Sequence, residues 1–288
     1  MKKFLIVPHE FAGFGAIIDR KIITTKIANE YNRIPIFLNA GWPYDDPYSY
    51  DHSYKEVGTA TSLFDYTDQQ DKVVLFDTNH WIQNVLSGSF KKRKVYEEGK
   101  ILSSFILKKE YQNVINSTLQ KIPQITGSIS IHIRRGDKND PNQEPFPYYT
   151  EIDDYIKTCI KISEQYGYSS VYINSDSLFA IEEACEKLEK LGFSCYYDTD
   201  QQRYDVNQNL TADNKFSASK SLELSKQETQ SSIKVIYTMA KSKHIIGMNN
   251  VQFTKLASFL LTYTSNANLG YTWLDSKTRG KNISYTIS

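Results

Sequence analysis

Residues 128–138 read Ser-Ile-Ser-Ile-His-Ile-Arg-Arg-Gly-Asp-Lys, so apolar and polar side chains alternate along most of their length. Alternation with a period of two is typical of a β-strand, whose successive side chains point to opposite faces of the sheet. The three isoleucines would share one face, while His132 and Arg134 would share the other. The pattern therefore predicts a buried strand that carries His132 and Arg134 on its polar face and Arg135 just beyond its C-terminal end.

Two adjacent arginines at such a position predict an anion site. In open α/β sheets, ligands bind outside the carboxyl ends of the strands, and a guanidinium group can bind phosphate oxygens through two parallel hydrogen bonds. Asp137 could orient one of the arginines, and Lys138 would add a point charge. The alternative interpretation is a surface ion-pair cluster, but charges at the end of a buried strand are costly without an anionic partner.

Extended and helical patterns alternate on both sides of this strand, which indicates an α/β fold. A Gly13-Phe14-Gly15 turn separates the first expected strand from the first expected helix. The expected strands cover 3–7, 33–38, 73–76, 128–134, 170–174, 193–197 and 244–247, and the expected helices cover 16–31, 100–120, 153–166, 177–191, 232–241 and 251–261. We expect two Rossmann-type lobes, residues 1–120 and residues 121–288, with a cleft between them.

The composition excludes several classes of protein. Hydrophobic residues at 40% and charged residues at 23% are typical of a globular chain and exclude a disordered one. A net charge of +1 gives no electrostatic case for a nucleic acid or an anionic membrane as partner. Three cysteines, few and odd in number, argue against a disulfide framework and for a reducing compartment. The apolar run after Lys3 is too short for a secretion signal, so we expect a soluble, cytoplasmic protein whose oligomeric state is open.

Residues 132–138 resemble the HxRRxDK motif of GDP-fucose-dependent fucosyltransferases. The resemblance is strongest to the α1,6 group, which contains the core N-glycan enzyme and the nodulation-factor enzyme. It extends to the Gly13-Phe14-Gly15 turn with the helix after it, to residues 151–156, to a strand at 171–176 that ends in Asp176, and to residues 240–257. The matched parts cover roughly residues 5–38 and 128–262, and the region from 40 to 120 is unmatched.

The resemblance implies a GT-B-like fold, in which the C-terminal lobe holds a GDP-sugar and the N-terminal lobe faces the acceptor. It also implies an inverting transfer of L-fucose from GDP-β-L-fucose to a hydroxyl group of a glycan acceptor, of the α1,6 type, without a metal ion or another cofactor. Preorganised cations can stabilise the charge that develops on the leaving GDP where no metal is bound. The expected partners are therefore the donor nucleotide sugar and a glycan or glycoconjugate, with no nucleic acid and no membrane span.

The resemblance also assigns roles to residues near the arginine pair. Arg134 and Arg135 would hold the pyrophosphate with help from Lys138, and His132 would contact the ribose or a phosphate. The base that takes the acceptor proton matches Glu144 best, and Asp140 is the competing carboxylate.

Further substrate contacts are implied elsewhere in the chain. Asp198 matches a guanine-reading aspartate, because a carboxylate can accept two adjacent N–H groups of the base. Asn250 and Gln252 stand at the start of a helix, where amide groups favour phosphate. Gly13 and Gly15 would let the backbone approach the sugar nucleotide or the acceptor.

Other functions remain open from the sequence. A relative could use another GDP-sugar or make an α1,2 or protein O-linkage, and a non-catalytic nucleotide- or carbohydrate-binding protein would keep the arginines without needing a base. Asp198-Thr199-Asp200 is a D-x-D triplet of the kind that holds a divalent ion in metal-dependent glycosyltransferases. A nicotinamide or flavin enzyme is disfavoured because Ile18 stands where a dinucleotide fingerprint needs its third glycine.

Overall fold

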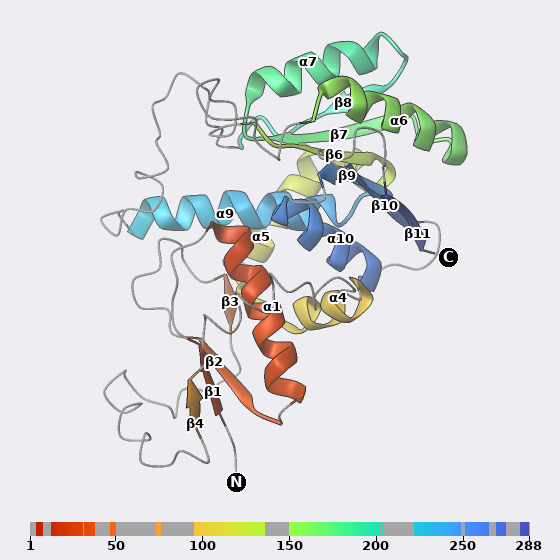
Figure 1. The fold of residues 1–288 in the computed structure, drawn as a ribbon. Helices are drawn as coiled ribbons and strands as arrows, with labels where there is room; N and C mark the ends of the chain where they lie inside the picture. Colours follow the sequence, from red (N-terminus) through yellow and green to blue (C-terminus); the bar gives the residue numbers. More distant parts are fainter. Residues whose placement is uncertain are drawn as a thin grey trace, which may run out of the picture.

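The computed structural model describes residues 4–7, 13–30, 32–37, 47–49, 73–75, 95–135, 150–201, 203, 222–248, 251–264, 269–274 and 283–287. Most of these residues belong to two separate sheets, one parallel and one mainly parallel, and to the helices that pack on them (Figure 1). The structure therefore confirms the α/β class expected from the sequence.

The larger sheet lies in the C-terminal half and has six strands in the order β11-β10-β9-β6-β7-β8. All neighbouring strands are parallel except β11, which runs antiparallel to β10. The strands are β6 (Ile129–Ile133), β7 (Ser170–Ser175), β8 (Ser194–Tyr196), β9 (His244–Met248), β10 (Leu269–Leu274) and β11 (Ile283–Ile287). The arginine-bearing strand β6 is thus central, and its carboxyl end lies between those of β7 and β9.

Helices cover both faces of this sheet. On one face, α6 (Ile152–Tyr166) and α7 (Leu178–Glu189) bury Ile129, Ile131 and Ile133 of β6 in a shared core. On the other face lie α5 (Lys109–Lys121), α9 (Leu222–Met239) and α10 (Gln252–Thr264), as Figure 1 shows. The two-residue alternation read from residues 128–134 is confirmed, because the isoleucines face α6 and α7 while His132 contacts α10.

The smaller sheet has the order β2-β1-β4, and its strands are parallel. It comprises β1 (Phe4–Val7), β2 (Ile34–Phe37) and β4 (Val73–Leu75), and α1 (Phe14–Glu30) follows β1. One side of α1 faces the C-terminal half: Phe14, Ile18 and Ile22 lie in the same buried cluster as residues of α9 and α10. The two halves therefore share a core. The expected lobe boundary near residue 120 stays a prediction.

The helix expected over residues 100–120 is instead two helices. They are α4 (Val95–Ser104) and α5, separated by the short strand β5 (Ile106–Leu107), which pairs antiparallel with β3 (Tyr48–Ser49). A short 3-10 helix, Pro123–Gly127, then leads into β6. The interruption comes from tertiary pairing with a distant segment, which local periodicity does not reveal. None of the helices in the described part of the chain is both long and apolar enough to cross a membrane.

Candidate active site

Arg134 and Asp176 directly follow the neighbouring parallel strands β6 and β7. The register pairs Ile133 with Ser175, so the next residue of each strand emerges at the same level. The Arg134 guanidinium donates through Nη1 to Asp176 Oδ2 and forms an ion pair with it. The other oxygen, Asp176 Oδ1, accepts the backbone N–H of Arg135 at 2.7 Å. Asp176 therefore orients Arg134, the role that the sequence analysis gave to Asp137, which lies outside the described residues.

The side chain of Arg135 is buried in the protein, unlike that of Arg134, and the residue is 4% exposed. Its Nη2 donates to the carbonyl oxygen of Thr150 at 2.8 Å, and its Nη1 donates to the carbonyl oxygen of Arg134 at 3.1 Å. The two adjacent arginines of the sequence thus have different surroundings, since the side chain of Arg134 is 30% exposed.

His132 is buried on the face of β6 that packs against α10. Its Nδ1 lies 3.4 Å from Thr254 Oγ1, and its ring centre lies 5.8 Å from that of Phe253. Burial lowers the pKa of His132 to about 4; Asp176 opposes this change and Arg134 reinforces it. His132 is therefore neutral near pH 7 and can act there as a hydrogen-bonding group rather than a cation.

The start of α1 contacts the start of α10, although the two segments stand near opposite ends of the sequence. A Cβ atom added at Gly15 would lie 2.8 Å from the Cβ of Gln252 and 3.0 Å from the ring of Phe253. The rings of Phe14 and Phe253 meet edge to face, with centres 6.5 Å apart. By contrast, a Cβ at Gly13 would have nothing within 4 Å. The structure thus brings Gly15, Gln252 and His132 into one neighbourhood through Phe253.

Several buried polar atoms of this neighbourhood lack a hydrogen-bond partner among the described residues. Gln252 Oε1 is one of them. Asn174 is fully buried, and neither its Oδ1 nor its Nδ2 has such a partner. Because Asn174 is the register partner of His132 on β7, both side chains stand on the same face of the sheet. Sequence reasoning missed Asn174, although the alternation Val171–Asn174 already places it on the polar side of its strand.

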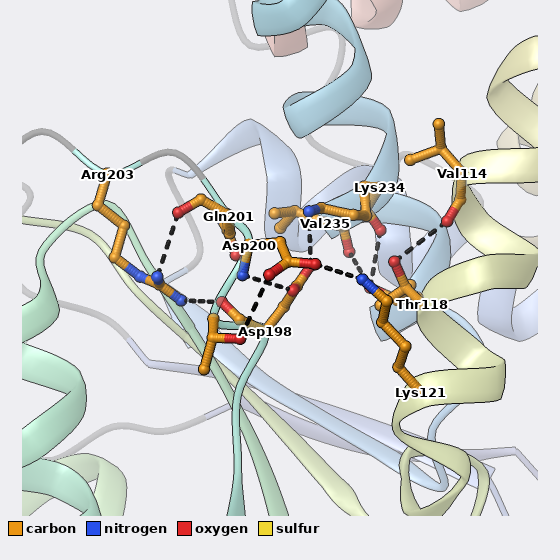
Figure 2. Close-up of polar contacts among 11 residues, drawn as sticks. Val114, Thr118, Lys121, Asp198, Asp200, Gln201, Arg203, Lys234 and Val235 are labelled. Atoms are coloured by element: carbon orange, nitrogen blue, oxygen red, sulfur yellow. Dashed lines mark hydrogen bonds and ion pairs between the residues drawn. The ribbon is translucent and has the colours of Figure 1, made fainter.

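Asp198 follows β8, and both of its carboxylate oxygens are engaged. Figure 2 shows Lys234 of α9 reaching Asp198 Oδ2, with 2.5 Å between Nζ and the oxygen. Asp198 Oδ1 accepts the backbone N–H of Asp200 at 3.0 Å, and Arg203 donates to the Asp198 carbonyl oxygen. Asp198 is only 4% exposed, so its expected role in reading guanine stays a prediction that this arrangement does not support directly.

Both aspartates of the D-x-D triplet form ion pairs with lysines. Asp198 pairs with Lys234, and Asp200 pairs with Lys121 of α5 (Figure 2). Nowhere in the described ranges do three or more His, Cys, Asp or Glu side chains gather in a group that could hold a metal ion. The charge of each carboxylate is therefore balanced by the protein itself.

Five of the residues singled out from the sequence lie outside the described residues: Asp137, Lys138, Asp140, Glu144 and Asn250. The role of Asp137 in orienting an arginine, that of Lys138 at the pyrophosphate and that of Asn250 at a phosphate therefore stay predictions. The same holds for Glu144 and Asp140 as candidate bases. The residues that the structure does bring together are Gly15, His132, Arg134, Asp176 and Gln252.

No protein-family model and no curated protein matches the sequence. Solved structures do match: fucosyltransferase NodZ from Bradyrhizobium is 11% identical with a TM-score of 0.58, and all of each chain is covered. NodZ α1,6-fucosyltransferase soaked with GDP-fucose is 13% identical, again with full coverage of both chains and a TM-score of 0.58.

Two further fucosyltransferases share the architecture. An Arabidopsis thaliana FUT1 variant in complex with GDP is 9% identical, with a TM-score of 0.51 and coverage of 95% of this chain and 70% of that one. POFUT1 in complex with GDP is also 9% identical, with a TM-score of 0.51 and coverage of 94% and 97%. At these identities the likeness concerns the fold, and it shows that this chain has the α/β, GT-B-like fold of NodZ.

Proposed function

We propose that the protein is a glycosyltransferase that moves L-fucose from GDP-β-L-fucose to a hydroxyl group of a glycan acceptor. The observation that carries the proposal is the oriented cation at the carboxyl end of the central strand, where Asp176 holds the partly exposed guanidinium of Arg134. In parallel α/β sheets this edge is where nucleotides bind. NodZ, whose fold the chain shares, has been crystallised with GDP-fucose and with GDP.

The proposed chemistry places negative charge next to Arg134. The acceptor oxygen attacks the anomeric carbon of fucose, the bond from that carbon to the β-phosphate oxygen breaks, and GDP leaves. Arg134, already fixed by Asp176, stabilises the charge that develops on the β-phosphate, which a preorganised cation does without reorientation. The start of α10 offers backbone N–H groups to the same ligand, and Gln252 Oε1, which has no hydrogen-bond partner among the described residues, can accept from a ligand hydroxyl.

Inversion at the anomeric carbon requires a base that removes the acceptor proton. We assign this role to Glu144, with Asp140 as the alternative, and we assign Lys138 and Asn250 to the donor phosphates. Asp198 is the proposed guanine contact, and His132 is proposed to face the ribose or a phosphate. These assignments come from the motif resemblance and give a reaction that needs no metal ion.

The C-terminal lobe would bind the donor and the N-terminal lobe the acceptor, in the cytoplasm. We propose an α1,6 linkage because the motif resembles that group most and NodZ shares the fold. An α1,2 linkage, a protein O-linkage and a different GDP-sugar are the alternatives. The acceptor is proposed only as a glycan or glycoconjugate.

The first test is a thermal-shift screen of the purified protein against GDP, GDP-fucose, UDP, CMP and ADP, with and without EDTA. A ligand that binds only the folded state raises the melting temperature, so selective stabilisation by GDP and GDP-fucose is expected, unchanged by EDTA. Stabilisation by UDP, or only with a divalent ion, would contradict the proposal. Release of GDP from GDP-fucose in the presence of glycan acceptors then tests turnover, and Glu144→Gln should abolish it; a binding protein without catalysis would be indifferent to that change.

A further inference from the structure

We propose that Arg135 is a positioning residue that does not contact the donor: its guanidinium ties the end of β6 to the start of α6 and so holds Arg134 in place. This inference rests on the proposed function, in which Arg134 faces the donor phosphate. It differs from the sequence expectation, in which both arginines hold the pyrophosphate.

Arg135 forms three hydrogen bonds with other described residues. Its backbone N–H reaches Asp176 Oδ1 at 2.7 Å, its Nη1 reaches the Arg134 carbonyl oxygen at 3.1 Å, and its Nη2 reaches the Thr150 carbonyl oxygen at 2.8 Å. Arg135 is 4% exposed, and Thr150 is also buried. One guanidinium group thus donates to two carbonyl oxygens, and the bond to Thr150 is buried, where a hydrogen bond is costly to lose.

The connection joins three elements at one point. The Arg134 carbonyl belongs to the chain leaving β6, the Thr150 carbonyl belongs to the chain entering α6 at Ile152, and Asp176 follows β7. Asp176 binds the side chain of Arg134 with one oxygen and the amide of Arg135 with the other. Moving the Arg135 backbone would therefore move both the peptide of Arg134 and the carboxylate contact that orients its guanidinium.

The two arginines should therefore affect different steps. A mobile Arg134 can still reach a bound nucleotide, so ground-state binding of GDP depends little on Arg135. Stabilising the transition state needs the cation already in place when the bond breaks, because preorganisation is what lowers the barrier. Loss of Arg135 should lower kcat much more than it weakens GDP binding, and loss of Arg134 should do both.

The experiment compares Arg134→Gln, Arg135→Gln and Arg135→Lys with the control Lys187→Gln. Lys187 of α7 pairs with Asp153 in the first turn of α6 at 2.8 Å and with Glu183 of its own helix at 2.7 Å. The control therefore removes exposed ion pairs beside the same helix start without touching the arginine cluster. Calorimetry gives the Kd of GDP, and GDP release from GDP-fucose gives kcat and KM.

We expect Arg134→Gln to raise the Kd of GDP about tenfold or more, as loss of a charge-assisted contact does. We expect Arg135→Gln to change that Kd less than about threefold while kcat per folded molecule falls at least about tenfold, the scale of losing preorganised stabilisation. Arg135→Lys, which can still donate to one carbonyl, should recover part of kcat. The control should match the wild type.

Three results of this comparison would overturn the inference. If Arg135→Gln raises the Kd of GDP as much as Arg134→Gln does, the guanidinium of Arg135 contacts the nucleotide. If kcat per folded molecule is unchanged, Arg135 contributes to stability alone. Reduced kcat in Lys187→Gln of the same size would likewise assign the effect to general loosening of α6 and contradict the inference.

Hydrogen exchange separates failure of this inference from failure of the proposed function. Amides at residues 150–156 should exchange faster in Arg135→Gln than in Arg134→Gln or the wild type, since only the first variant frees the Thr150 carbonyl. Faster exchange in Arg135→Gln supports the tie between β6 and α6 whether or not the wild type binds GDP. Absence of GDP binding by the wild type would refute the proposed function alone. Unchanged exchange in Arg135→Gln would refute the tie whatever the activity shows.

Discussion

Asp176 binds two consecutive residues with its two oxygens, and one of these bonds orients the side chain of Arg134. It accepts from the Arg134 side chain and from the Arg135 amide, and its side chain is only 14% exposed. A partly desolvated carboxylate that neutralises a guanidinium contributes through both charge and direction. We therefore expect Asp176 to act on catalysis through Arg134.

Asp176→Asn keeps the shape of the side chain, removes its charge and turns an NH2 group toward one of its two donors. We expect kcat/KM for GDP-fucose to fall roughly tenfold to a hundredfold, because charge-assisted hydrogen bonds contribute about 1.5–3 kcal/mol each. Steady-state GDP release measures the change. Asp153→Asn is the matched control, because Asp153 is an exposed partner of Lys187, and it should leave kcat/KM within about twofold of the wild type. Equal losses of kcat/KM in both variants would contradict a role of Asp176 in orienting Arg134.

Two buried histidines predict how stability depends on pH. Burial lowers the pKa of His132 and that of His244 to about 4, below the value near 6.5 expected in the unfolded chain. Between these pH values the unfolded chain binds more protons than the folded one, so the free energy of unfolding falls as the pH falls from about 6.5 toward 4. The slope is up to roughly 1.4 kcal/mol per pH unit for each histidine.

His244→Gln isolates one of these contributions. His244 Nε2 lies 2.9 Å from Thr272 Oγ1, a contact that glutamine can replace without a titrating group, and it is remote from the arginine cluster in the sequence. Urea unfolding at pH 7 and pH 5 should show a smaller loss of stability for the variant than for the wild type. Identical losses in both proteins would mean that His244 titrates normally in the folded state.

Local sequence predicts the side-chain directions within β6 but not those beyond its end. His132 lies on the polar face as the alternation requires, because the sheet imposes a period of two as far as Ile133. Arg135 follows the last paired residue, so its direction is set by the Thr150 carbonyl, which comes from the segment entering α6. Asp176 likewise contacts Arg134 because strand pairing brings the ends of β6 and β7 together, which local sequence does not reveal.

At the scale of elements, the contact between α1 and α10 depends on the absence of a side chain at Gly15. An alanine Cβ there would lie 2.8 Å from the Gln252 Cβ and 3.0 Å from Phe253 Cδ1, which forces the helices apart. Overpacking of this kind costs about 1–3 kcal/mol. We expect Gly15→Ala to lower the free energy of unfolding by this amount and to weaken GDP binding, because Gln252 opens α10.

Chemical denaturation and GDP calorimetry check this expectation. Gly127→Ala is the matched control, since a Cβ at Gly127 has nothing within 4 Å, and its stability should stay within about 0.5 kcal/mol of the wild type. If both substitutions lowered the stability equally, the loss would come from the backbone freedom of glycine and not from the contact between α1 and α10.

Elements were predictable where their periodicity was local and strong. The helix start at Ser177 was expected, and its Oγ does accept the Ala180 N–H. Helix α9 begins at Leu222 and not at the expected Ser232. Its first half is polar and shows no apolar stripe, so the sequence pattern does not reveal that this half is helical. Strand β10 was not anticipated at all, since its place depends on pairing with β9 on one side and β11 on the other.

At the scale of the whole molecule, helix α1 of the N-terminal half shares an apolar core with helices of the C-terminal half. Phe14, Ile18 and Ile22 of α1 lie in the same buried cluster as Ile233 and Val235 of α9 and Leu256 and Phe259 of α10. Residues 102–115 of α4 and α5 join it as well, although the sequence analysis assigned them to the N-terminal lobe. A motif resemblance with an unmatched region from 40 to 120 could not predict this shared core.

A shared core predicts that the chain unfolds as one unit. Separating α1 from α9 and α10 would expose the aromatic and isoleucine side chains of both halves at about 25 cal/mol for each Å² of apolar surface, so neither half should melt alone. Scanning calorimetry should therefore give a single transition whose calorimetric and van't Hoff enthalpies agree, and GDP should shift that whole transition upward. Two resolved transitions, with GDP moving only one of them, would show instead that the lobes are independent and that the contact of Gly15 with α10 contributes little to their association.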